Sequence, residues 1–176
     1  KAWQLGESLE QLNYLAGERT MILPLLNGIE HIDLLVNSFG NRVLGGLCRI
    51  SSFVAGPGHI THVAVKPSIT FGELNNEKSG RIQELYEVFS AIDGIIVEIP
   101  EDIQAAMWEK FVFICSTSGV GAVTRQPMDV FRAVPESRIM LESALREVEN
   151  IARVKNVALP FDLVATLMKR IDGLPD

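Results

Sequence analysis

Lys110 is the side chain best placed for chemistry, because it interrupts an otherwise apolar segment at Trp108-Glu109-Lys110-Phe111. On a helix, Lys110, Ile114, Thr117 and Ser118 recur at i, i+4, i+7 and i+8, so that one cation and two hydroxyls share a face. An ammonium on such a face can stabilise or protonate an oxygen that gains negative charge. The spacing alone fits better a lysine that packs its methylenes on apolar surface and extends its charge into solvent. Both interpretations stay open.

Asn27-Gly28 is the second candidate, because it directly follows the apolar run of residues 21–26. Asn-Gly favours a tight turn. Ligands of α/β proteins also bind at the carboxyl ends of strands, where this dipeptide would lie. The pattern therefore indicates either a plain turn or a ligand contact.

Two glycine patterns fall short of a nucleotide-binding fingerprint, which needs a third Gly or Ala between a strand and a helix. They are Gly56-Pro57-Gly58, which we place between two strands, and Gly119-Val120-Gly121, which we place in a turn or close contact beside a helix.

The histidines and serines give weaker signals. His59 and His62 point to opposite faces of an extended strand and have no carboxylate or cysteine cluster beside them, so we expect no metal site. His31, at the start of a helix, is expected to be a partly exposed residue without function. Residues 116–118 carry three hydroxyls, but no histidine follows them closely, so a nucleophilic serine is unsupported.

Composition limits the class of protein. The 176 residues are 47% hydrophobic with a net charge of -6, which excludes intrinsic disorder and disfavours nucleic acid or an anionic membrane as a partner. The longest apolar runs are much shorter than the roughly 20 residues of a membrane span. Two unpaired cysteines and a start at Lys1 without signal-peptide features predict a cytoplasmic protein.

The first hundred residues alternate helical and strand-like patterns. We expect a helix over 5–16 with a left-handed Gly17 after it, a buried strand over 21–26, and a helix over 30–39. Three strands of a meander should follow at 43–54, 60–65 and 68–74. A helix around 82–89 and a strand over 94–99 complete this part.

Beyond Glu101 the sequence predicts helices alone. Leu141, Leu145, Val148 and Ala152 share one face of a long helix that Asn156 would end, and its Glu-Arg pairs at i,i+4 should form a solvated face. The fold class is therefore α/β plus all-α. We expect a partial Rossmann-like dinucleotide domain over 1–100 and part of a helical domain over 101–176.

Several short motifs, in order and at matching intervals, resemble ketopantoate reductase (2-dehydropantoate 2-reductase). They are Lys1-Ala2-Trp3-Gln4, Leu26-Asn27-Gly28, Val43-Leu44-Gly45-Gly46, Gly58-x-Ile60-x-His62, Ile69-Thr70-Phe71-Gly72-Glu73, Asp102-Ile103 and Trp108-Glu109-Lys110.

The resemblance implies NADPH-dependent reduction of 2-dehydropantoate to pantoate. By this analogy Lys110 is the general acid, Lys1, Asn27 and Gly28 contact the cofactor, and Asn27 together with the positions of Ile114 and Ser118 contacts the substrate. The partners implied are a small 2-keto acid and a second copy in a homodimer. The helical part, residues 101–176, would serve substrate binding and dimerisation.

The sequence departs from the family's pattern in two respects. The family's glycine-rich turn and its later helices are absent from this chain, which by itself is expected to be inactive. Asparagines are usual four and eight residues after the lysine, where this sequence has Ile114 and Ser118, so a different 2-keto acid is possible. The alternatives are another nicotinamide-dependent dehydrogenase of similar architecture, or a non-catalytic dimerisation or binding domain.

Overall fold

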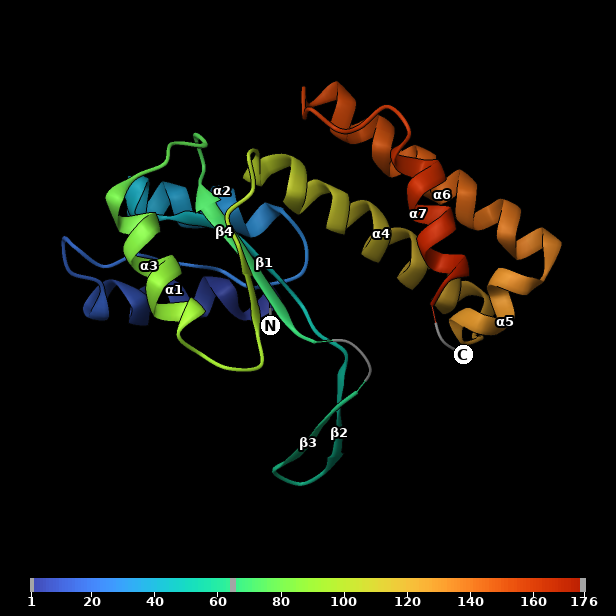
Figure 1. The fold of residues 1–176 in the computed structure, drawn as a ribbon, viewed down its shortest axis with the longest axis horizontal. Coiled ribbons are helices and arrows are strands. Elements are labelled where there is room, and N and C mark those ends of the chain that lie inside the picture. The colour runs from blue at the N-terminus through green and yellow to red at the C-terminus, as the bar shows by residue number, and fades with distance from the viewer. Residues whose placement is uncertain (1, 64–65, 175–176) are drawn as a thin grey trace. The chain divides into compact units, whose positions relative to one another are not determined.

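The computed structural model describes residues 2–63 and 66–174 and divides the chain into two compact units. An α/β unit extends to Ile103, and a helical unit begins at Gln104 (Figure 1). The expected fold class, α/β followed by all-α, is confirmed.

A three-stranded sheet in the order β1-β4-β5 forms the centre of the α/β unit. Figure 1 labels β1 and β4 of this sheet. β1 (Leu44–Arg49) pairs antiparallel with β4 (Ser68–Glu73), and β4 pairs parallel with β5 (Ile96–Glu98). The helical segments of this unit are η1 (Ala2–Gln4), α1 (Leu5–Leu15), α2 (Glu30–Phe39), η2 (Gly40–Arg42) and α3 (Gly80–Ser90).

The two faces of this sheet pack against different elements, because neighbouring side chains of a strand point to opposite sides. Leu44 and Phe71 are completely buried and cluster with Ile82 of α3. Val43, one residue before Leu44, instead clusters with Leu35 of α2 and Leu5 of α1. Apolar helix faces of period 3.6 thus cover both sides of a short sheet.

The expected meander is wrong in its pairing. The strand predicted over 43–54 is interrupted at Ile50 and Ser51, which divide it into β1 and β2 (Ser52–Gly56). Among residues 2–63 and 66–174, β2 pairs with β3 (His59–His62) alone, as a separate hairpin around the turn with Gly58 at φ 70°. β1 instead pairs with β4, the strand that follows this hairpin in the chain. The alternation of apolar and polar side chains along a strand does not specify which strand it pairs with. The end of the third expected strand, at 64–65, lies outside the described residues.

The buried strand expected over 21–26 is also reduced. Within this segment Ile22 alone pairs as a strand residue, through one isolated parallel bridge to Val43. The Ile22 carbonyl accepts a hydrogen bond from the Leu44 amide at 2.9 Å. Pro24 follows two residues later and has no N–H to donate, which explains why regular pairing stops.

The first helix ends differently from the prediction. Ala16 turns into extended backbone, and Gly17 is not among the residues with positive φ. The Arg42 guanidinium donates to the carbonyls of Ala16 and Gly17 at 3.2 and 3.0 Å. A distant side chain therefore satisfies the carbonyls that a left-handed glycine would otherwise help to bond.

The helical unit consists of α4 (Ile103–Thr124), which starts on the last residue of the α/β unit, α5 (Met128–Ala133), α6 (Pro135–Val154) and α7 (Leu163–Asp172). α6 buries Leu141, Leu145, Val148 and Ala152, as predicted, and Asn156 follows it at φ 59°. Glu142 and Arg146 form an exposed pair, but Glu149 is buried and bonds Arg153 at 2.6 Å. The expectation of an entirely solvated charged face is therefore wrong for Glu149.

Among the described residues, none of the helices has the length and apolar character needed to cross a bilayer. Cys48 is half-buried, with its Sγ 3.8 Å from the Leu25 carbonyl oxygen, and Cys115 is exposed.

Candidate functional site

Lys110 lies on α4 among residues whose side chains are buried. Met107, Trp108 and Val112 are buried, and the rings of Trp108 and Phe111 pack edge to face with centroids 5.5 Å apart. Lys110 itself is half-buried, between the exposed and the buried face of the helix. A partly desolvated ammonium interacts more strongly with a negative oxygen than one in bulk water.

Fewer hydroxyls are available on the Lys110 face of α4 than the sequence spacing predicts. Thr117 is buried, and its hydroxyl donates to the Phe113 carbonyl of its own helix at 2.8 Å. Ile114 is half-buried and Ser118 is exposed. The face toward the carboxyl end of α4 therefore offers the Ser118 hydroxyl next to an apolar Ile114.

Asn27 and Gly28 form the turn that precedes α2 in the α/β unit. Gly28 has φ 95°, which glycine adopts without strain, and a Cβ added there would meet no heavy atom within 4 Å. Asn27 is exposed. The turn is therefore an open surface with an amide side chain and accessible backbone.

This turn fits the neutral end of a nicotinamide cofactor better than a phosphate. An amide side chain and main-chain groups can bond a carboxamide or a ribose hydroxyl. The first turn of α2 contains Glu30 and Asp33, whose carboxylates oppose the positive end of the helix dipole and disfavour an anion. Lys1, the other expected cofactor contact, lies outside the described residues.

The structure also places the histidines and glycines that gave the weaker sequence signals. His31 is buried in α2, so the expectation of partial exposure is wrong. His59 and His62 are exposed on β3, and no group of three potential metal ligands occurs among residues 2–63 and 66–174. Gly119 and Gly121 lie inside α4 and not in a turn, and a Cβ on Gly121 would lie 3.5 Å from the Phe131 ring of α5.

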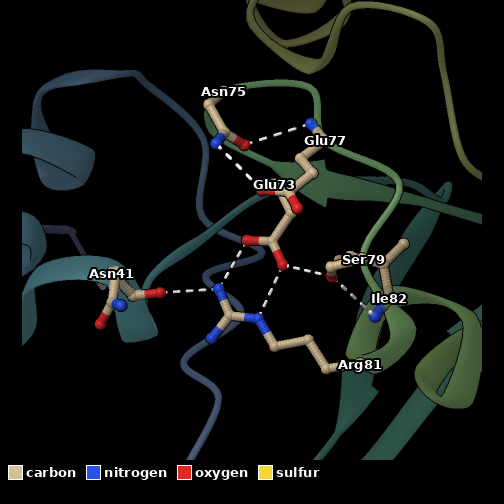
Figure 2. A network of polar contacts seen from close by, with 7 residues as sticks. All are labelled: Asn41, Glu73, Asn75, Glu77, Ser79, Arg81 and Ile82. Carbon is tan, nitrogen blue, oxygen red and sulfur yellow. Dashed lines mark hydrogen bonds and ion pairs between the residues drawn. The ribbon is translucent and has the colours of Figure 1, made fainter.

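A polar network at the end of β4 was not predicted. Glu73 accepts from Arg81 Nε at 2.7 Å, from Arg81 Nη2 at 2.5 Å and from Ser79 Oγ at 2.6 Å, while Arg81 also bonds the Asn41 carbonyl (Figure 2). The Arg81 hydrogen bond lowers the pKa of the Glu73 carboxyl below its ordinary value. The sequence signal is an acid and an arginine eight residues apart across a polar loop, which is too common to identify a pair.

Two sequence models match the chain in separate segments. The one described as "Ketopantoate reductase PanE/ApbA" matches residues 1–76, and "Ketopantoate reductase PanE/ApbA C terminal" matches residues 102–176. Both halves of one family's architecture are thus found in order. The chain belongs to the ketopantoate reductase family.

Relatives are similar to this ketopantoate reductase family chain over nearly all of its own length. Uncharacterized oxidoreductase YkpB of Bacillus subtilis (strain 168) is 30% identical over 158 residues, 89% of this chain and 52% of that protein. The 2-dehydropantoate 2-reductase of Porphyromonas gingivalis W83 is 28% identical with a TM-score of 0.86, covering 96% of this chain and 58% of that one.

A structure of D-mandelate dehydrogenase with NADH has a TM-score of 0.85 at 21% identity and covers 98% of this chain and 58% of that one, a likeness of fold. The chain spans about half the length of the curated relatives it matches.

Proposed function

We propose that the whole protein reduces the ketone of a 2-keto acid with a nicotinamide cofactor, and that Lys110 is its general acid. The observation that carries the proposal is the half-buried Lys110 among buried neighbours on α4, inside the segment that matches the family's C-terminal model. The substrate we assign first is 2-dehydropantoate, reduced to pantoate, with NADPH as the cofactor.

Lys110 has a defined task in this reaction. The cofactor, when bound, supplies a hydride to the carbonyl carbon. The carbonyl oxygen then gains negative charge, which the Lys110 ammonium stabilises before donating one proton to give the alcohol. Lys110 becomes a neutral amine and regains a proton from water. Partial burial of Lys110 strengthens the interaction with the oxygen.

Asn27 and Gly28 are assigned to the cofactor and the substrate. The exposed Asn27 amide can donate to a carbonyl oxygen and accept from an amide or hydroxyl, which orients the two reactants. The backbone at Gly28 has room for a ligand against it. The two residues assigned to the cofactor belong to the α/β unit.

A 2-keto acid with an apolar side chain is the second candidate substrate, and Ile114 favours it. Ile114 lies one helical turn beyond Lys110 and cannot hydrogen-bond, and the nearby Thr117 hydroxyl is already bonded to its own helix. A hydroxyl-bearing substrate would therefore find Ser118 as the polar partner on that face.

Steady-state kinetics of the whole protein tests the proposal. We expect kcat/KM with NADPH to be highest for 2-dehydropantoate among a series of 2-keto acids with polar, aliphatic and aromatic side chains. A higher value for the apolar members would support the second candidate. Absence of turnover with every keto acid and with both NADPH and NADH would refute the proposed reaction.

A further inference from the structure

The first residue of α4 is fixed on the sheet of the α/β unit by contacts that neither the motifs nor the proposed reaction explain. The Ile103 amide donates a 2.9 Å hydrogen bond to Asn76 Oδ1, 27 residues earlier in the chain. An amide at the start of a helix has no partner within the helix, so Asn76 caps α4 from outside it.

Asn76 is held in the geometry that this cap requires. It adopts φ 62°, a left-handed conformation that asparagine tolerates better than most residues, and its own amide donates to the Glu73 carbonyl at 2.9 Å. Glu73 is fixed in turn by Arg81 and Ser79 (Figure 2). The cap is thus anchored to the end of β4.

The Ile103 side chain is also closely packed against the sheet of the α/β unit. It is 1% exposed and lies over Gly45 of β1 and Gly72 of β4, which are direct partners across the ladder. A Cβ on Gly45 would approach Ile103 Cγ1 to 2.6 Å, and one on Gly72 would lie 3.4 Å from Ile103 Cβ. The glycine pair therefore leaves a hollow for Ile103, an arrangement that we call the Ile103 seat.

Lys110 lies seven residues after Ile103 on the same face of α4, two turns or about 10 Å along the axis. A small tilt of the first turn is magnified over this distance, and misplacing a reacting group by about 1 Å can cost roughly 100-fold in rate. We propose that Asn76 and Gly45 are positioning residues for Lys110, acting through the Ile103 seat; this inference rests on the proposed function of Lys110.

Asn76→Gly in the whole protein tests the cap, because glycine keeps the left-handed backbone and removes the amide oxygen. We expect kcat to fall by roughly 10-fold or more with KM for the cofactor unchanged. Amide exchange at the first turn of α4 should become faster. Asn76→Asp retains an acceptor oxygen and should restore most of kcat. Asn75→Gly is the matched control, since Asn75 bonds Glu77 and not α4.

Gly45→Ala tests the seat from the opposite side, because its methyl would collide with Ile103. We expect a similar loss of kcat, and the double variant Gly45→Ala with Ile103→Ala should lose less than the two single effects combined. Gly80→Ala, where a Cβ meets nothing within 4 Å, should retain full activity.

The outcomes separate this inference from the proposed function. Full kcat in folded Asn76→Gly and Gly45→Ala variants, with Lys110→Ala inactive, would overturn the positioning role alone. Lost stability with kcat preserved below the unfolding transition would overturn it too, since the seat would then be merely structural. An active Lys110→Ala would overturn both proposals.

Discussion

Glu73 and Arg81 form a two-pronged ion pair in which both carboxylate oxygens are bonded by the guanidinium, at 2.7 and 2.5 Å. The Glu73 side chain is 10% exposed and that of Arg81 31%. Because the pair joins the end of β4 to the first turn of α3, it stabilises the same corner that holds Asn76.

Glu73→Gln should lower the free energy of unfolding by roughly 1–2 kcal/mol at neutral pH, because a charged hydrogen-bonded pair is lost while solvent screens part of the effect at Arg81. Since the pKa of Glu73 is lowered in the folded state, its contribution is complete above the unfolded pKa, about 4.3, and is lost as the pH falls through the folded value. Denaturant unfolding at several pH values measures this.

The matched control for Glu73 is Asp172→Asn. Asp172 makes an equally short pair with Arg138, and that bond lowers the pKa of its carboxyl, but both side chains are substantially exposed. We expect a smaller loss at Asp172 than at Glu73. A gap between wild type and Glu73→Gln that stays constant down to pH 2 would contradict the assigned role of Glu73.

Gly46→Ala should destabilise the α/β unit by about 1–3 kcal/mol, since overpacking forces neighbours from their preferred geometry. An added Cβ would lie 2.4 Å from Leu23 Cδ1 and 2.9 Å from the Pro24 carbonyl oxygen. Thermal unfolding of this variant is compared with that of Gly80→Ala. Equal unfolding midpoints for the two variants would show that Leu23 and Pro24 can move to accommodate the added methyl group without loss of stability.

Periodicity along the chain predicts the helices well and the strand partners poorly. The face of α6 and the left-handed Asn156 are local properties, and both are confirmed. The pairing of β1 with β4 joins residues that are far apart in the chain, such as Gly46 with Phe71 and Leu47 with Thr70, and no local pattern identifies these partners.

The candidate site shows the same division between local and distant features. The helical spacing of Lys110 and Ser118 follows from the sequence. Two other features depend on three-dimensional geometry and cannot be predicted from residue spacing. They are the hydrogen bond from the Thr117 hydroxyl to its own helix and the cap that Asn76 provides for α4.

Asn27→Ala in the whole protein should raise KM for the cofactor by roughly threefold to tenfold, the value of one hydrogen bond. Because Asn27 is exposed, stability should change by less than about 0.5 kcal/mol. Asn37→Ala, exposed on α2, is the control. Unchanged kinetic constants at Asn27 would mean that the residue only forms the turn.

Ile114→Asn should lower KM for keto acids that bear a hydroxyl more than it changes kcat, because it adds a hydrogen bond to the bound substrate near Lys110. Steady-state kinetics with hydroxylated and unsubstituted keto acids separates the two effects. Ile139→Asn introduces the same change at an exposed position of α6 and should leave both constants unaltered. A uniform loss for all substrates would count against Ile114 as a substrate contact.

The most direct test of the central claim is kcat of Lys110→Ala in the whole protein with a saturating keto acid and NADPH. Removal of the general acid should reduce kcat by roughly 100-fold or more. The unfolding midpoint should hardly move, and Lys169→Ala, an exposed lysine of α7, should keep the wild-type kcat. A Lys110→Ala enzyme with near-normal kcat would show that Lys110 merely packs on the helix surface with its charge in solvent.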